Sequence, residues 1–239
     1  KKAEQLGYGV YVKELPRFNP ENIQYIIDWF LTRQVDGIIW AVPEIGDNRS
    51  WIDDFMDQIE VPIIFLTAAD RLNVSTVVID NYQGAKIATD HIISRGKKKI
   101  AHISGPLDWW ESKQRFLGWQ DALIREGIKP NENMVAEGNW SSKSGKKAFD
   151  QLLCSFPEMD AIFVANDQMA LAVLHTACEK GINIPKDLLV VGFDNIPESE
   201  FFYPSLTTVS QDLLSLGCLA VEELIYLIRA KNLKQTTSK

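Results

Sequence analysis

The sequence predicts an α/β fold with parallel sheets. Short apolar runs recur along its 239 residues, and most of them lack the alternation of a half-exposed strand. Such runs are typical of parallel strands that are covered on both faces. Amphipathic stretches with a helical period separate them, and strands that alternate with helices indicate βαβ units.

Each predicted strand is one of these apolar runs. In chain order they are residues 8–12, 37–40, 61–66, 76–79, 99–104, 133–137, 161–164 and 188–192. The first run follows KKAEQLG, which reads as the last turns of a helix that Gly7 ends.

The predicted helices between the strands each show one apolar face. These faces are formed by Ile23, Ile27, Phe30 and Leu31, by Ala85, Ala88 and Ile92, by Leu171, Leu174, His175 and Cys178, and by Leu216, Ala220, Leu224 and Leu227.

The composition fits one large domain or two small lobes, since 46% of the residues are hydrophobic and 24% are charged. The formal net charge is -7 and no basic stripe occurs, so we expect no nucleic-acid binding by this chain itself. No apolar run is long enough to span a membrane, and we expect no membrane partner.

The cysteines Cys154, Cys178 and Cys218 are odd in number and form no C-x-x-C pair. We therefore predict free, buried thiols and a reducing, cytoplasmic location.

Enzyme signatures do not occur in the sequence. It contains no G-x-x-x-x-G-K-[ST], no G-x-G-x-x-G and no G-x-S-x-G motif, and its three histidines are dispersed. We predict no catalytic residue, no metal ligand and no cofactor.

One strand end carries a ligand-site pattern. The run 188–192 is followed by Asp194 and Asn195, and polar side chains at the carboxyl end of a parallel strand often face a binding crevice. An ordinary loop start explains the aspartate equally well, so both interpretations stay open on this evidence.

Four segments in order resemble the effector-binding core of LacI/GalR family transcription regulators, whose fold is the periplasmic-binding-protein-like type I fold. They are HISGPLDWWESKQRFLGWQDAL (102–123), EGNWSSKSG (137–145), IFVANDQMALAVLHTACEKGINIP (162–185) and DLLVVGFDNIPESEFFYPSLTTVSQ (187–211).

The resemblance implies two similar lobes with a ligand cleft between them. Residues 1–80 and 212–239 would form the first lobe, and residues 81–211 the second. Cores of this family carry a further strand before the point that matches Lys1, and full-length members carry a helix-turn-helix before that. We therefore expect a first lobe that is incomplete at its start, with operator DNA bound outside this chain.

The resemblance also implies an effector site for a small sugar or polyol. Arg115, in QRFLGW, matches a guanidinium that grips hydroxyl groups, and Asp194 matches a carboxylate that accepts from them. The other expected contacts are Asn166, Trp140, Trp40, Trp109 and Trp110. The alternatives are an exposed helical Arg115 and an Asn166 that only caps its helix.

Two positions depart from sugar-responsive members. Thr67 stands where some members have an aspartate, and Leu213 stands where some have a ring-stacking aromatic residue. The identity of the effector therefore does not follow from the resemblance.

The resemblance further implies a homodimer that is formed through residues 168–181 and 198–203. The runner-up function is an extracytoplasmic sugar-binding protein of a transporter, which shares the two-lobed fold. The segment FFYPSLTTVSQD favours the regulator.

Overall fold

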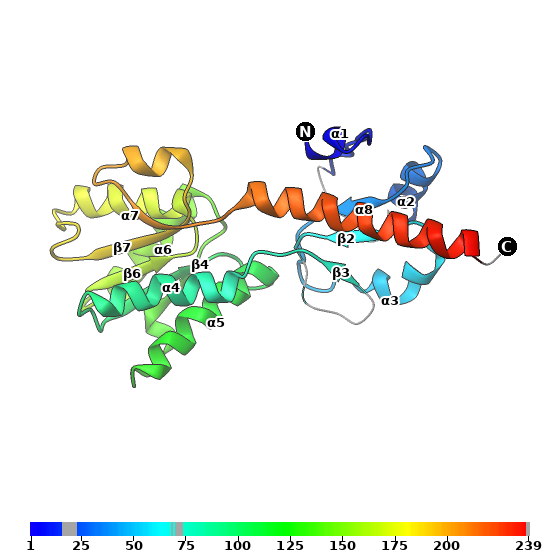
Figure 1. Cartoon of the computed structure of the whole chain (residues 1–239). Coiled ribbons are helices and arrows are strands. Elements are labelled where there is room, and N and C mark those ends of the chain that lie inside the picture. The colour runs from blue at the N-terminus through cyan, green and yellow to red at the C-terminus, as the bar shows by residue number, and fades with distance from the viewer. Residues whose placement is uncertain (16–22, 68, 70–73, 238–239) are drawn as a thin grey trace. The chain divides into compact units, whose positions relative to one another are not determined.

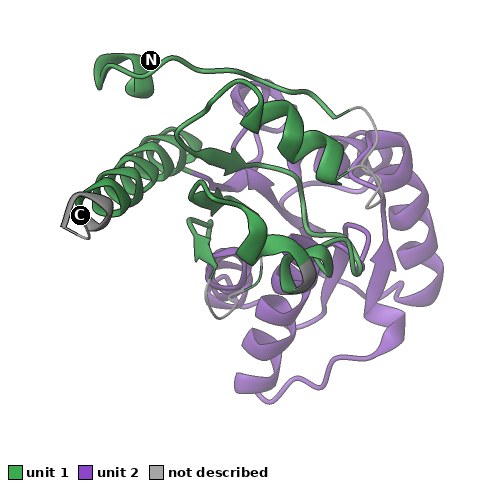
Figure 2. Cartoon of the chain, turned by 90° about the vertical axis from the view of Figure 1, so that its right-hand side faces the viewer, with its two compact units in different colours: residues 1–79, 212–239 green, residues 80–211 purple. Residues whose placement is uncertain are grey.

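The chain divides into two compact units (Figure 2). The computed structural model describes residues 1–15, 23–67, 69 and 74–237. Unit 1 comprises Lys1–Ile79 and Asp212–Lys239, and unit 2 comprises Asp80–Gln211. The chain crosses between the units twice, at residues 79–80 and 211–212. All the strand pairs found among the described residues are parallel, so the predicted α/β class with parallel sheets is confirmed.

Unit 2 is a five-stranded sheet with two pairs of helices (Figure 1). The strands have the order β5-β4-β6-β7-β8, with β4 (Ile100–Ser104), β5 (Val135–Glu137), β6 (Ala161–Val164), β7 (Leu189–Asp194) and β8 (Thr207–Ser210). The helices are α4 (Asn81–Ser94), α5 (Trp110–Arg125), α6 (Ser142–Ser155) and α7 (Asp167–Glu179), with 3₁₀ turns η3 (Glu132–Met134) and η4 (Pro197–Phe201). Helix α4 packs against α5, and α6 packs against α7.

The strand order of unit 2 creates a switch point. The chain runs from β4 outward to β5, and then returns past β4 to β6. Strands β4 and β6 are fully buried neighbours whose connections lead in opposite directions. The carboxyl ends of two such strands leave a crevice, which is where α/β sheets usually bind ligands.

Unit 1 is a three-stranded sheet between helices. Its elements are α1 (Lys2–Gln5), α2 (Ile23–Leu31), β1 (Ile38–Trp40), α3 (Trp51–Phe55), η2 (Met56–Gln58), β2 (Ile63–Phe65), β3 (Ser75–Thr76) and α8 (Leu213–Thr237). Because strand side chains alternate between faces, Trp40 and Phe65 join one core cluster, whereas Ile64 joins a second cluster with Ala220 and Leu224 of α8.

The predicted strand at residues 8–12 is wrong. In the described part of the chain, residues 9–15 form no backbone–backbone hydrogen bond, and Val10, Tyr11 and Val12 are exposed. An apolar cavity of about 810 Å³ is lined both by this segment and by β1, the edge strand of the sheet. The sequence has strand character here, but a strand needs a paired neighbour to satisfy its backbone groups.

Gly118 permits the close approach of α5 to α4. A Cβ atom at this position would collide with the backbone oxygen of Tyr82 and would also meet the Cβ atom of Ala85. We expect Gly118→Ala to lower the free energy of unfolding by about 2 to 3 kcal/mol, because a backbone atom cannot move aside as a flexible side chain can. Urea unfolding measures this change.

Gly217 provides the matched control in α8, because nothing lies within 4 Å of a Cβ atom built there. Gly217→Ala is expected to raise stability by up to about 1 kcal/mol through helix propensity alone. Equal effects of the two substitutions would contradict the close packing of α4 and α5.

Candidate functional site

The predicted effector residues of unit 2 gather where its strands end. Arg115 lies on α5, which follows β4, and Asn166 lies two residues after the end of β6. Asp194 is the last residue of β7. These residues therefore surround the switch point between β4 and β6.

Arg115 is a buried cation with three oxygen partners. Its side chain donates from Nε to Asn81 Oδ1 at 2.8 Å and from Nη1 to the backbone oxygen of Ala165 at 2.5 Å. Nη1 also lies 3.5 Å from Asp194 Oδ1, and the guanidinium lies 3.8 Å from the centre of the Phe193 ring. Arg115 is only 6% exposed, so the alternative of an exposed helical arginine is wrong.

Asp194 is held in an unusual backbone conformation. Its φ angle is +120°, and that of Asn195 is +56°, a region that residues with a side chain rarely adopt. Gln211 Nε2 donates to Asp194 Oδ1 at 2.5 Å. Burial raises the pKa of Asp194 from 3.8 to about 6, although the Arg115 charge acts in the opposite direction.

Asp167 stabilises the turn that follows Asp194. Its carboxylate accepts hydrogen bonds from the backbone N–H of Ile196 at 2.9 Å and from the Thr208 hydroxyl at 2.6 Å. Burial raises the pKa of Asp167 as well.

Asn166 has the capping role that its sequence position suggests. Its Oδ1 accepts from the N–H of Met169 at 2.9 Å and so caps α7, while Nδ2 donates to the backbone oxygen of Trp140 at 3.0 Å. Asn166 thus holds the backbone of Trp140 in place beside α7. A direct contact between Asn166 and an effector stays a prediction.

Trp140 and Trp109 form an aromatic corner beside the Arg115–Asp194 pair. Their ring centres are 5.7 Å apart in an edge-to-face arrangement, and the Arg115 guanidinium lies 5.6 Å from the Trp140 ring. The Trp140 ring packs so closely on Gly105 that a Cβ atom there would overlap it. Trp110 begins α5 and is half-buried.

Trp40 lies in the core of unit 1. It is 3% exposed, and its ring centre is 5.3 Å from that of Trp51 and 6.4 Å from that of Phe65. The ring is therefore a packing element of this unit. A contact between Trp40 and an effector stays a prediction.

Sequence reasoning missed three residues of this site: Asn81, Asp167 and Gln211. Their hydrogen bonds to Arg115, to the turn after Asp194 and to Asp194 itself depend on tertiary structure. The only signal in the sequence was that each one directly precedes or begins a helix or follows a strand.

Other chemistry finds little support in the part of the chain that the structure describes. No group of three or more His, Cys, Asp or Glu residues there could hold a metal ion, and no helix there is long and apolar enough to cross a membrane. The prediction of buried thiols is wrong, because Cys154 and Cys178 are free but exposed. Helix α7 buries its small residues against the sheet, including Ala170, Val173 and Ala177, so Cys178 faces outward.

A polar and aromatic site at the switch point of a parallel sheet defines a class, the small-molecule-binding α/β proteins. The family model of the periplasmic binding protein-like domain matches residues 89–238. The lactose operon repressor of Escherichia coli (strain K12) is 31% identical over 233 residues, which are 98% of this chain and 64% of that protein.

Solved structures agree with this assignment. The lac repressor dimer bound to operator and the anti-inducer ONPF gives a TM-score of 0.87 at 30% identity, covering 96% of this chain and 79% of that one. A complex of the transcriptional regulator CelR with cellobiose gives 0.77 at 30% identity, covering 87% and 64%.

The chain belongs to the LacI/GalR family of transcription regulators and contains the effector-binding core of that family. It spans 64% of the length of the lactose operon repressor. The curated relatives include the lactose operon repressor and the HTH-type transcriptional repressor PurR of Vibrio atlanticus, which are not enzymes, and this favours the regulator over the transporter protein.

Proposed function

We propose that this chain senses a small saccharide or polyol through the cluster around Arg115 and Asp194. One observation carries the proposal: a buried guanidinium and a carboxylate lie beside the aromatic corner of Trp109 and Trp140. Adjacent sugar hydroxyls require planar polar groups, and the C–H face of a sugar ring requires an aromatic surface. The similar CelR–cellobiose complex supports a disaccharide as the first ligand to test.

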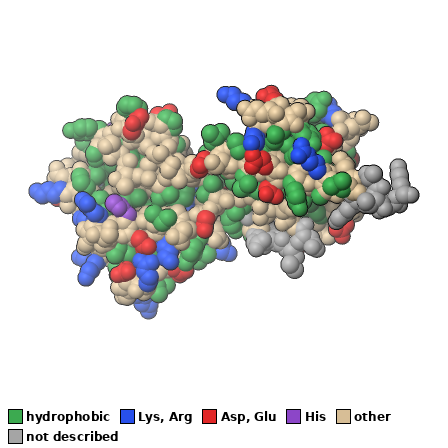
Figure 3. All heavy atoms as spheres, in the orientation of Figure 1, with side chains coloured by type: hydrophobic (Ala, Val, Ile, Leu, Met, Phe, Trp, Pro, Cys, Tyr) green, Lys and Arg blue, Asp and Glu red, His purple; other side chains and the backbone are tan. Residues whose placement is uncertain are grey.

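In the full-length protein we propose that effector binding changes operator binding through a helix-turn-helix domain outside this chain. The similar lac repressor structure contains operator DNA, which supports this role. The chain itself has a net charge of -7, and acidic and basic side chains are interspersed on the face seen in Figure 3. DNA affinity within this chain would require a basic surface.

Titration calorimetry tests the sensing role. The panel contains cellobiose, lactose, glucose, galactose and sorbitol, with a purine base as a ligand of another class. Binding of a saccharide or polyol supports the proposal. Binding of the purine base alone, or of none of these ligands, contradicts it.

The aromatic corner is tested by Trp140→Ala. We expect the affinity for the sugar that binds best to fall about tenfold or more, because the substitution removes a stacking surface in a desolvated site. Trp29→Ala is the control, since Trp29 also carries a guanidinium, that of Arg33, at 3.8 Å, but lies in unit 1. An unchanged affinity of the Trp140 variant would remove Trp140 from the site.

We further propose that the chain forms a homodimer through α7 and η4. Phe201 is 80% exposed and Tyr203 is 92% exposed, and Leu171 on α7 is exposed as well. Two large aromatic side chains that are exposed so close together along the chain are costly to leave in water, and this supports an interface here. We expect a dimeric mass at micromolar concentration and a monomeric mass for the Phe201→Ser/Tyr203→Ser variant, whereas a monomeric wild-type chain would contradict the proposal.

A further inference from the structure

The two crossings of the chain both make a hydrogen bond to the Arg115–Asp194 pair. After the first crossing, Asn81 is the second residue of unit 2, and its Oδ1 accepts from Arg115 Nε at 2.8 Å. Before the second crossing, Gln211 is the last residue of unit 2, and its Nε2 donates to Asp194 Oδ1 at 2.5 Å. A chain of hydrogen bonds therefore runs from one crossing to the other through the candidate effector site.

The two bonds to the crossings are shorter than the contact within the charged pair. Arg115 Nη1 and Asp194 Oδ1 are 3.5 Å apart, so each charge lies closer to a crossing residue than to the other charge. Asn81 is buried, as is Arg115. Bonds between a charged group and a neutral amide are strong where water is excluded, and their loss leaves a buried charge poorly compensated.

On their other side, both crossings are fixed to the same core of unit 1. Val77, two residues before Ile79, packs in the cluster that contains Ala220 and Leu224 of α8. Asp212 follows Gln211, and its carboxylate accepts from the N–H of Ser215 at 2.9 Å in the first turn of α8. Along each crossing, the chain therefore runs only a few residues from the hydrogen bond at the site to the core of unit 1.

We infer that Asn81 and Gln211 are positioning residues that couple occupancy of the effector site to both crossings. This inference rests on the proposed function, since it assigns the route by which the same site acts. A ligand hydroxyl that donates to Asp194 Oδ1 takes the position that Gln211 Nε2 holds, and a ligand oxygen that accepts from Arg115 Nε takes the position that Asn81 Oδ1 holds. Such a ligand binds more tightly to the state in which the hydrogen bonds of Asn81 and Gln211 to the charged pair are broken. Its difference in affinity between the bonded and the broken state shifts the equilibrium toward the broken state.

Hydrogen exchange in the ligand-free chain tests the coupling. Gln211→Ala is expected to speed amide exchange in residues 77–84, at the other crossing, by about tenfold, the effect of losing one bond to a charged group. Asn81→Ala should do the same in residues 207–213. Amide exchange in the double variant should be only slightly faster than in either single variant, because the effects of substitutions within one network are not additive.

Each variant has a neighbour as its matched control. Tyr82→Phe removes the hydrogen bond that the Tyr82 hydroxyl, on the exposed side of α4, donates to Asp121 of α5. Ser210→Ala removes the hydrogen bond between the Asn195 side chain and the Ser210 hydroxyl. Neither control should change exchange at the opposite crossing. If the controls act like Asn81→Ala and Gln211→Ala, or if each variant affects only its own crossing, the inference is overturned.

A rescue variant separates the hydrogen bond from simple packing. Asp194→Asn with Gln211→Glu exchanges donor and acceptor while both side chains keep their shape, and exchange should return to within about twofold of wild type. Gln211→Glu alone places two carboxylates together and should speed exchange as Gln211→Ala does. These measurements need no ligand, so a failed sugar titration contradicts the proposed function alone, and absent coupling contradicts this inference alone.

Discussion

The Asp194→Asn substitution is expected to raise the free energy of unfolding at pH 7 by about 2 to 3 kcal/mol. Burial raises the pKa of this carboxyl from 3.8 to about 6. Folding therefore stabilises the neutral form of the Asp194 side chain relative to the charged form. The difference between these two values corresponds to about 3 kcal/mol, and asparagine imitates the neutral form. Position 194 also has a positive φ angle, which costs less free energy for asparagine than for most residues.

The pH dependence gives the sign of this effect. Because the folded-state pKa lies above the unfolded-state value, the folded chain holds more protons between pH 3.8 and about 6. The contribution of Asp194 to stability is therefore present at low pH and is lost as the pH rises through 6. The difference between variant and wild type should be near zero at pH 4 and complete above pH 6.

Urea unfolding at pH 4 to 8 measures this dependence, and Asp90→Asn on the exposed side of α4 is the control. Burial also raises the pKa of Asp167, but that residue is present in both proteins and cancels in the comparison. A difference that stays constant between pH 4 and 8 would contradict the buried carboxylate.

The same substitution should weaken saccharide binding tenfold to a hundredfold, because it removes the charge from a hydrogen-bond acceptor. The variant would thus be more stable and less able to sense its effector. Such opposition is common where a functional site keeps a costly buried charge.

Most of the fold could be predicted from the sequence because parallel strands that are covered on both faces leave short, uninterrupted apolar runs. The run 161–164 is β6 to the residue, and the run 99–104 contains β4. The strand predicted at residues 8–12 is wrong because the apolar pattern of a strand is visible in the local sequence, whereas its pairing with a neighbouring strand is not. The face of α7 was also assigned wrongly, since alanine at 170 and 177 gives a weak signal beside Leu171 and Cys178.

The site could be predicted only in part. Arg115, Asp194, Asn166, Trp109 and Trp140 do lie together, and the resemblance indicated their positions. The effector itself, and any contribution from Trp40, stay predictions. The hydrogen bonds of Asn81 and Gln211 were beyond reach, because they join residues 34 and 17 positions apart along the chain.

The Arg115→Met substitution is expected to lower the free energy of unfolding by about 3 to 5 kcal/mol and to abolish saccharide binding. Methionine fills much of the space but removes the hydrogen bonds that Arg115 donates to Asn81 Oδ1, to the backbone oxygen of Ala165 and to the Asp194 carboxylate. Removing Arg115 is costly because burial disfavours the Asp194 charge even beside Arg115, and the variant loses the attraction that partly offsets this cost.

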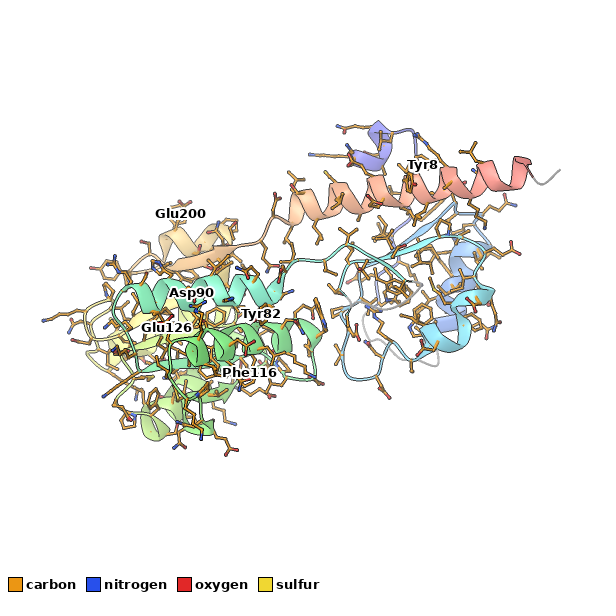
Figure 4. The ribbon with its side chains drawn as sticks, turned by 60° about the horizontal axis from the view of Figure 1, so that its bottom comes forward. Tyr8, Tyr82, Asp90, Phe116, Glu126 and Glu200 are labelled. Carbon is orange, nitrogen blue, oxygen red and sulfur yellow. The ribbon has the colours of Figure 1, made fainter. Side chains whose placement is uncertain are left out.

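Arg125→Met is the matched control on the same helix. Arg125 also contacts carboxylates, those of Asp90 and Glu126, but its side chain is 45% exposed, so we expect a change below about 1 kcal/mol. Figure 4 labels Asp90 on α4 and Glu126 at the end of α5. The Arg115→Met/Asp194→Asn variant should recover most of the lost stability, because no buried charge is left without compensation. If the double variant is as unstable as Arg115→Met, the loss comes from packing and not from the charge of Asp194.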